Sequence, residues 1–321
     1  MASNVFAILL FIALTLGFAT AVRAAWRTGK GYIRWPGVIV GGLLSVIALL
    51  VTGLSIKGFS AVYSKIGRPV QTMAVDRTAD RVARGQHIAN VLCASCHTTS
   101  TQLPLTGGRN LAEDIHVPLG YLTPYNLTPS GPLKDWSDGE IFRAIREGAD
   151  KDGNKLMVMS GQTARYLGDD DLKSVIAFLR SQPAVPGEIR KDHLNPLGLV
   201  LVGAKMVPTI DEPPPLTVAT PARGPTAEYG EYIVKWAGCR ECHGVALNGT
   251  DGGLLPPGPS LRITKGWTGE QFIQTFRTGV DPFGKKLDPL LMPWKFVGRM
   301  DDDELQAIYG YLQKLEIPLK K

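Results

Sequence analysis

Two long uncharged segments near the N-terminus constrain this chain more than any other feature. Residues 4–22 (NVFAILLFIALTLGFATAV) and 37–56 (GVIVGGLLSVIALLVTGLSI) contain no Asp, Glu, Lys or Arg. A helix of about 20 apolar residues spans the roughly 30 Å hydrocarbon core of a bilayer. Because uncharged segments of this length are rare in soluble cores, we expect two transmembrane helices.

The basic residues between these segments predict their orientation. Arg23, Arg27, Lys30 and Arg34 lie in the short connecting loop, and by the positive-inside rule this loop is cytoplasmic. We therefore expect a two-pass anchor in a bacterial cytoplasmic membrane, with the N-terminus and everything after the second helix in the periplasm. A cleaved signal peptide is the alternative for the first segment. The lack of a basic region before the apolar run argues against it.

The charge distribution supports contact with a lipid bilayer and not with nucleic acid. The chain has 321 residues and a formal net charge of +6. Residues 1–79 hold eight Lys or Arg and one Asp, so the positive excess lies in the anchor. The remainder is close to neutral, without the basic patch that a nucleic-acid-binding domain needs.

All four cysteines fall in two copies of one short motif. Cys93-Ala-Ser-Cys96-His97 and Cys239-Arg-Glu-Cys242-His243 both read C-x-x-C-H, the attachment signature of c-type haem. Two thiols on one helical turn reach the two vinyl groups of a single porphyrin, and the adjacent imidazole projects to the iron. We predict two covalently bound haem c groups.

A redox dithiol or half of a zinc site is the competing interpretation of C-x-x-C alone. The following histidine, the duplication and the predicted periplasmic location all favour haem, which is attached outside the cytoplasm. No cysteine remains for a disulfide.

The two motifs lie in an internal repeat. Residues 136–140 (WSDGE) correspond to 267–270 (WTGE), and the acidic starts of the last helices correspond at 167–179 and 300–312. Apolar residues recur at helical spacing and no convincing alternating strand is present, so the fold class is mainly α. The predicted organisation is an anchor (1–59), a connector (60–77), domain one (78–182), a Pro-rich linker (183–225) and domain two (226–321).

Methionine or a second histidine usually completes the coordination of such an iron. Met292 stands just before the last helix of domain two, and Met159 has the same place in domain one. Met157 is the rival in domain one but breaks the register of the repeat. We therefore predict iron ligation by His97 with Met159 and by His243 with Met292. His116 is a further alternative to Met159.

Glycine and proline follow each motif in segments 107–111 (GGRNL) and 257–261 (PGPSL). We expect these segments to bring backbone close to the porphyrin, with a carbonyl that accepts a hydrogen bond from Nδ1 of the motif histidine. The alternative is that these glycine and proline residues only shape the loops. The segment 121–128 (YLTPYNLT) is a weaker candidate for contact with haem propionates.

Both domains resemble class I cytochrome c over about two hundred residues. Domain one is most similar to the cytochrome c subunits of membrane-bound bacterial dehydrogenases, through its haem motif, residues 122–129 (LTPYNLTP) and the 136–148 segment. That resemblance implies an electron relay with His/Met ligation. Those subunits commonly carry three haems and a C-terminal anchor. The N-terminal anchor and two motifs are similar instead to the dihaem subunit of cbb3-type oxidases.

The function that we expect is electron transfer between a membrane redox complex and an extracytoplasmic partner, in a respiratory or photosynthetic chain. Two closed irons leave no position for a substrate, so the chain is not expected to be an enzyme on its own. Candidate partners are a dehydrogenase, a quinol-oxidising complex, an oxidase, a reaction centre or a soluble electron carrier. A peroxidase or thiosulfate-oxidising enzyme with an open iron is the alternative, and a structural or assembly subunit is a third.

Overall fold

The computed structural model describes residues 1–115, 118–187, 192–207, 213–251 and 257–319. The chain divides into two units. The first consists of Met1–Lys65, Asn110–Leu122 and Lys191–Thr209, and the second of Ile66–Arg109, Thr123–Arg190 and Ile210–Lys321. Helices predominate in both, which confirms the predicted fold class.

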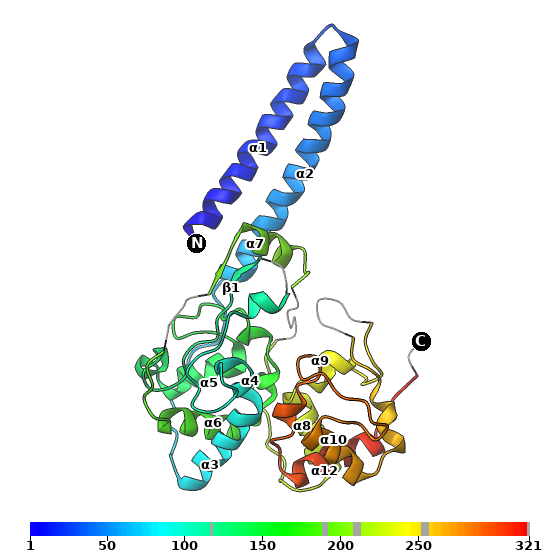
Figure 1. Cartoon of the computed structure of the whole chain (residues 1–321). Coiled ribbons are helices and arrows are strands. Elements are labelled where there is room, and N and C mark those ends of the chain that lie inside the picture. The colour runs from blue at the N-terminus through cyan, green and yellow to red at the C-terminus, as the bar shows by residue number, and fades with distance from the viewer. Residues whose placement is uncertain (116–117, 188–191, 208–212, 252–256, 320–321) are drawn as a thin grey trace. The chain divides into compact units, whose positions relative to one another are not determined.

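The first unit is built on two long N-terminal helices that run side by side, α1 (Ala2–Arg27) and α2 (Gly31–Tyr63) (Figure 1). Both are long and apolar enough to cross a membrane. Large apolar side chains such as Leu9 and Leu43 are exposed along them. A continuous exposed apolar surface of this kind is rare in water and suits a lipid environment.

A short apolar helix, α7 (Pro196–Gly203), packs against α2 by close backbone contact. A Cβ added at Gly58 of α2 would lie 1.9 Å from the carbonyl oxygen of Leu199, and one at Gly203 would lie 2.0 Å from that of Leu54. Small residues at a helix crossing let the two backbones approach in this way. The contact fixes part of the predicted linker on the anchor.

The remaining elements of the first unit are a short 3-10 turn, η2 (Leu111–Ile115), and a two-stranded ladder. Strands β1 (Gly120–Tyr121) and β2 (His193–Leu194) pair antiparallel, with Gly120 opposite Leu194. The buried Asn4 side chain donates from Nδ2 to the Leu194 carbonyl oxygen at 2.8 Å. Residues far apart in the chain thus meet at the first turn of α1.

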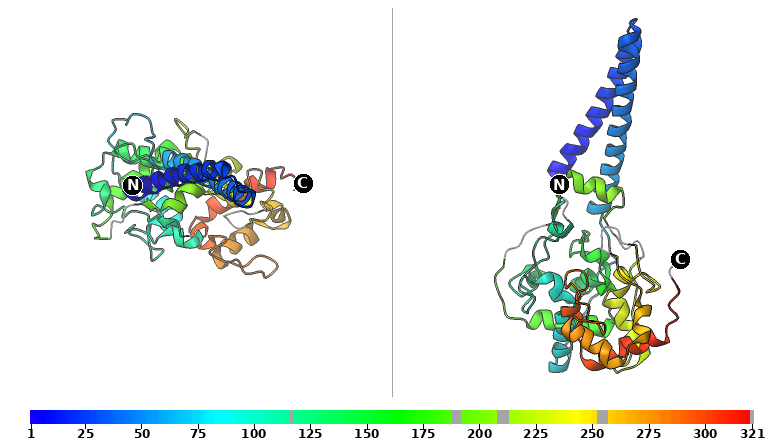
Figure 2. Two further views of the ribbon diagram at one scale, coloured as in Figure 1. Left: turned by 90° about the horizontal axis from the view of Figure 1, so that it is seen from above. Right: turned by 45° about the vertical axis from the view of Figure 1, so that its right-hand side comes forward.

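The second unit contains the repeat, whose first half consists of α3 (Ala79–Ile88), the π-helical turn η1 (Ala89–Cys93), α4 (Ala94–His97), η3 (Pro132–Asp135), α5 (Asp138–Glu147), η4 (Met159–Gly161), η5 (Thr163–Tyr166) and α6 (Asp169–Ser181). The second half consists of α8 (Ala227–Trp236), α9 (Cys239–His243), η6 (Leu261–Gly266), α10 (Gly269–Thr278), α11 (Trp294–Val297) and α12 (Asp302–Lys314). Figure 2 gives two further views of these elements.

The same local chemistry shapes both halves. Ser137 and Thr268 each close a capping box at the start of α5 and α10, and Gly148 and Gly279 end those helices in the left-handed conformation. In each half the first and last helices cross at a glycine. A Cβ at Gly85 would lie 1.8 Å from the Ser174 carbonyl oxygen, so no larger residue fits that crossing.

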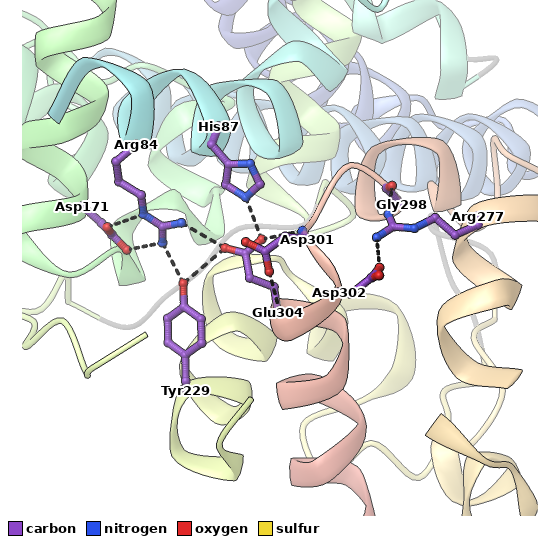
Figure 3. Close-up of polar contacts among 9 residues, drawn as sticks. All are labelled: Arg84, His87, Asp171, Tyr229, Arg277, Gly298, Asp301, Asp302 and Glu304. Carbon is purple, nitrogen blue, oxygen red and sulfur yellow. Dashed lines mark hydrogen bonds and ion pairs between the residues drawn. The ribbon is translucent and has the colours of Figure 1, made fainter. Parts of the chain in front are cut away.

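A buried polar cluster joins the two halves of the second unit (Figure 3). The Arg84 guanidinium donates to both carboxylate oxygens of Asp171 in its own half, at 2.8 and 2.9 Å, and to Glu304 Oε1 in the other half at 2.9 Å. His87 Nε2 lies 2.6 Å from Glu304 Oε2, and Tyr232 donates its hydroxyl to Asp171 Oδ2 at 2.8 Å. The charged side chains of Arg84, Asp171 and Glu304 are almost fully buried.

The cluster follows the repeat. His87 in α3 and Tyr232 in α8 are equivalent positions, and so are Asp171 in α6 and Glu304 in α12. Each aromatic side chain contacts the carboxylate of the other half. The two halves therefore meet across a local pseudo-two-fold arrangement.

Candidate haem-attachment sites

The three chemistry-bearing residues of each motif share one short helical segment. Cys93 ends the π-helical turn η1, and Cys96 and His97 lie in α4. Cys239, Cys242 and His243 all lie in α9. π-Helical turns inside helices occur often at functional sites, and η1 leads directly into the first motif. Helical geometry therefore presents both thiols and the imidazole from one turn of chain, as the motif predicted.

Both motif histidines are buried and held through Nδ1. His97 Nδ1 lies 2.8 Å from the carbonyl oxygen of Tyr125, and His243 Nδ1 lies 2.7 Å from that of Pro259. Burial lowers the pKa of both imidazoles, and the carbonyl contact opposes it. The rings are therefore neutral at pH 7, with Nδ1–H donated to the carbonyl. This is the tautomer that offers the Nε2 lone pair to a metal.

The carbonyl that holds each histidine was predicted for segments 107–111 and 257–261. In domain two Pro259 lies in the predicted segment. In domain one the prediction is wrong, because the acceptor is Tyr125. The chain between Gly108 and Tyr125 is an insertion relative to domain two, where Pro259 follows Gly258 directly, and most of that insertion belongs to the first unit.

Gly108 and Gly258 explain why these segments contain glycine. A Cβ at Gly108 would lie 1.8 Å from the carbonyl oxygen of Cys96, and a Cβ at Gly258 would lie 2.2 Å from that of Cys242. Each glycine therefore lets the following loop pass directly over the second cysteine of its motif. The loop backbone at each glycine therefore lies against the helix that carries the haem motif.

The cysteine thiols lack the environment of a redox dithiol. No disulfide joins any of the four. Burial, with a smaller contribution from the neighbouring motif cysteine, raises the pKa of Cys93 to about 12. Burial likewise raises the pKa of Cys239 to about 12. A reactive dithiol needs a cysteine whose pKa is lowered, so the structure argues against that alternative.

The methionines proposed as second ligands lie in the turns that follow the central helix of each half. Met159 begins η4, which packs against α5, and Met157 lies just outside that turn. Met292 precedes α11, and its backbone N–H donates to the Asp288 carbonyl oxygen at 2.9 Å. All three are half-buried. The choice of Met159 over Met157 stays a prediction.

The other histidines have separate places. His87 belongs to the polar cluster described above, and His193 lies in β2. His116 falls outside the described residues. In the segment 121–128, Asn126 and Thr128 are buried and bond to the Val185 carbonyl oxygen, a structural role that the sequence did not predict.

Comparison with known proteins gives a family for each half. Residues 82–183 match the family described as cytochrome c, and residues 225–312 match the family described as cytochrome c oxidase, cbb3-type, subunit III. The chain is also similar to a subunit of the nicotinate dehydrogenase of Pseudomonas putida strain KT2440, with 26% identity over 310 residues. That match covers 88% of this chain and 25% of the relative, so the chain spans about a quarter of the relative's length.

The chain therefore contains two cytochrome c domains behind two apolar N-terminal helices, and the resemblance predicted from the motifs is confirmed. Cytochrome c domains imply covalently bound haem c. The residues fit that group, because each motif combines two thiols with a neutral, oriented imidazole.

Proposed function

We propose that this chain is a membrane-bound dihaem c-type cytochrome that passes electrons between a membrane redox complex and an extracytoplasmic partner. The observation that carries the proposal is the duplicated attachment helix, in which a neutral histidine is held by a backbone carbonyl beside two thiols. Bound haem iron supplies one-electron exchange between its ferric and ferrous states.

The chain's own residues have three tasks in this role. Cys93 and Cys96 would hold the first porphyrin, and Cys239 and Cys242 would hold the second. The Tyr125 and Pro259 carbonyls orient the two imidazoles and raise their basicity as ligands. Met159 and Met292 are the proposed sixth ligands. Methionine raises the potential relative to a second histidine and closes the iron to substrates, which favours a carrier over a haem enzyme.

The relative points to the class of partner. It is a subunit of a dehydrogenase, so we place this chain beside a membrane-associated dehydrogenase as electron donor. Two apolar helices joined by a basic loop favour a periplasmic position for the cytochrome domains. A cytochrome fixed there passes electrons onward to the respiratory chain.

Two measurements test this proposal. The haem content of the purified chain, determined from the pyridine haemochrome spectrum, should be two per chain. Gentle solubilisation of native membranes should then recover a dehydrogenase with this chain in fixed stoichiometry. Recovery of the cytochrome alone would make it a tethered shuttle.

Carbon monoxide separates the carrier from an enzyme. Because both irons are expected to be six-coordinate, the reduced protein should show little spectral change with this ligand. Avid binding at either haem would contradict the carrier assignment and favour a peroxidase or a thiosulfate-oxidising enzyme.

A further inference from the structure

A single arginine of the second cytochrome domain contacts both sides of the first attachment segment. Arg299 donates from Nη1 to the backbone oxygen of Asn90 at 2.8 Å and to its Oδ1 at 2.9 Å. It donates from Nη2 to the carbonyl oxygen of Thr101 at 2.6 Å. Asn90 lies just before Cys93, and Thr101 lies just after His97. One guanidinium therefore holds the two ends of the segment that carries all three haem-binding residues.

The charge of this guanidinium has no carboxylate partner in the described part of the chain. Its three acceptors are neutral amide oxygens, and its Cζ lies 4.6 Å from the centroid of the Phe296 ring. Arg277, by contrast, pairs with Asp302, and Arg84 pairs with two carboxylates. The Arg299 side chain is half-buried, and burial lowers its pKa. Its charge is therefore held in place by three neutral acceptors without a carboxylate to offset it.

In the other direction, the first domain contacts the second attachment segment through a hydroxyl group. The 3-10 turn η5 of the first domain packs against α8, and Thr163 donates its hydroxyl to the Trp236 carbonyl oxygen at 2.9 Å, just before Cys239. Likewise α11 of the second domain packs against η1 of the first. Each domain therefore braces the attachment segment of the other. The contact on the first attachment segment is made by the Arg299 guanidinium.

We infer that Arg299 sets the reduction potential of the first haem from within the second domain. The inference rests on the proposed function, since it needs haem at Cys93, Cys96 and His97. A fixed positive charge beside a haem opposes the additional positive charge of the ferric state. It therefore stabilises the reduced form and raises the potential. Arg299 is a positioning residue, because it acts through the attachment segment and the local field.

The test is a potentiometric titration of the full chain in mild detergent, followed by visible spectra. Each haem should give one reduction wave, and the wave of the first haem is called the first wave. It is assigned with a double variant, Cys93→Ala with Cys96→Ala, in which that wave disappears. Arg299→Gln should shift the first wave to lower potential and leave the second wave in place. Arg299→Lys keeps the charge but loses the forked contact. Its first wave should therefore stay close to the potential of that wave in the unmodified chain.

Arg262→Gln is the matched control. It removes the same charge from the same domain, but the Arg262 guanidinium donates to the Ile317 carbonyl oxygen within that domain. It should leave the first wave unchanged. An unshifted first wave in Arg299→Gln, an equal shift of both waves, or a shift in Arg299→Lys as large as in Arg299→Gln would overturn the inference.

Haem content is measured first on every variant. An unmodified chain without covalent haem would contradict the proposed function. Two haems with an unaltered first wave in Arg299→Gln would contradict only the role of Arg299. The two failures are thus distinguishable.

Discussion

Removing the buried charge of Glu304 should destabilise the contact between the two cytochrome domains far more than removing an exposed charge nearby. Glu304 accepts from four donors. Its Oε1 accepts from Arg84 and from the Tyr229 hydroxyl, and its Oε2 accepts from His87 Nε2 and the Asp301 backbone N–H. In Glu304→Gln the side-chain amide would place its own N–H groups against two of these donors. The capping box survives, because glutamine also serves at that position.

The magnitude follows from the pKa of this carboxyl. Burial alone would raise it, but the hydrogen bond and charge of His87, followed by those of Arg84, lower the pKa from 4.5 to about 2. One pKa unit corresponds to about 1.4 kcal/mol, so the ionised carboxylate contributes roughly 3 kcal/mol at neutral pH. Because the pKa is depressed in the folded state, this stabilisation is complete above pH 4.5. It is lost as the pH falls from about 4.5 to about 2.

The assay is urea unfolding of the full chain in mild detergent, followed by far-UV circular dichroism at pH 7 and through a series down to pH 3. Asp302→Asn is the control on the same helix (Figure 3). Its side chain is 74% exposed, against 2% for Glu304. An exposed pair of this kind contributes no more than about 1 kcal/mol.

Glu304→Gln should lower the urea midpoint clearly more than Asp302→Asn at pH 7, and its difference from the unmodified chain should shrink as the pH falls below 4.5. Equal midpoints for the two variants would refute the reasoning. So would a difference that does not change with pH.

The remaining predictions concern the ligands and the helix crossing. Met292→Ala should open the second iron, so that the reduced protein binds carbon monoxide and the second wave moves to lower potential. Met159→Leu should do the same to the first haem, whereas Met157→Leu should leave the spectrum unchanged. Gly230→Ala should destabilise the protein by about 1–3 kcal/mol or more, because its Cβ would lie 2.0 Å from a carbonyl oxygen of α12. Gly310→Ala, on α12 itself, meets nothing within 4 Å and should stabilise slightly in the same unfolding assay.

Local chemistry made much of this fold predictable. The repeat, the helical class and the helix starts follow from patterns of a few residues, such as the Ser137–Glu140 capping box and the acidic first turn at Asp169. The attachment helices follow from cysteine spacing. The two N-terminal helices were predicted as residues 4–22 and 37–56, and the structure extends them to Ala2–Arg27 and Gly31–Tyr63. Helices continue beyond a bilayer core wherever propensity allows.

Contacts between distant segments were beyond the same reasoning. Tyr125 holds His97 across an insertion, and periodicity gives no sign of where such an insertion returns. Arg299 and Asn90 are separated by most of the soluble chain, so no local pattern links them. The repeat did hold a signal for the polar cluster. Aligning its halves places His87 with Tyr232 and Asp171 with Glu304. These four polar groups lie on helix faces whose other residues are mostly apolar.

The matching glycine crossings have a consequence for how the chain is assembled. Since α3 crosses α6 at Gly85 and α8 crosses α12 at Gly230 in the same way, a newly made α3 has two similar docking partners within one polypeptide. We expect the order of synthesis to favour the native pairing, because α6 precedes α8 and α12 in the chain. Domains emerge from the ribosome N-terminal first, and the long segment 183–225 delays the second pair until α3 has already found α6. A circular permutation that places α12 before α6 would remove this advantage. We expect it to let α3 pair with α12 in place of α6.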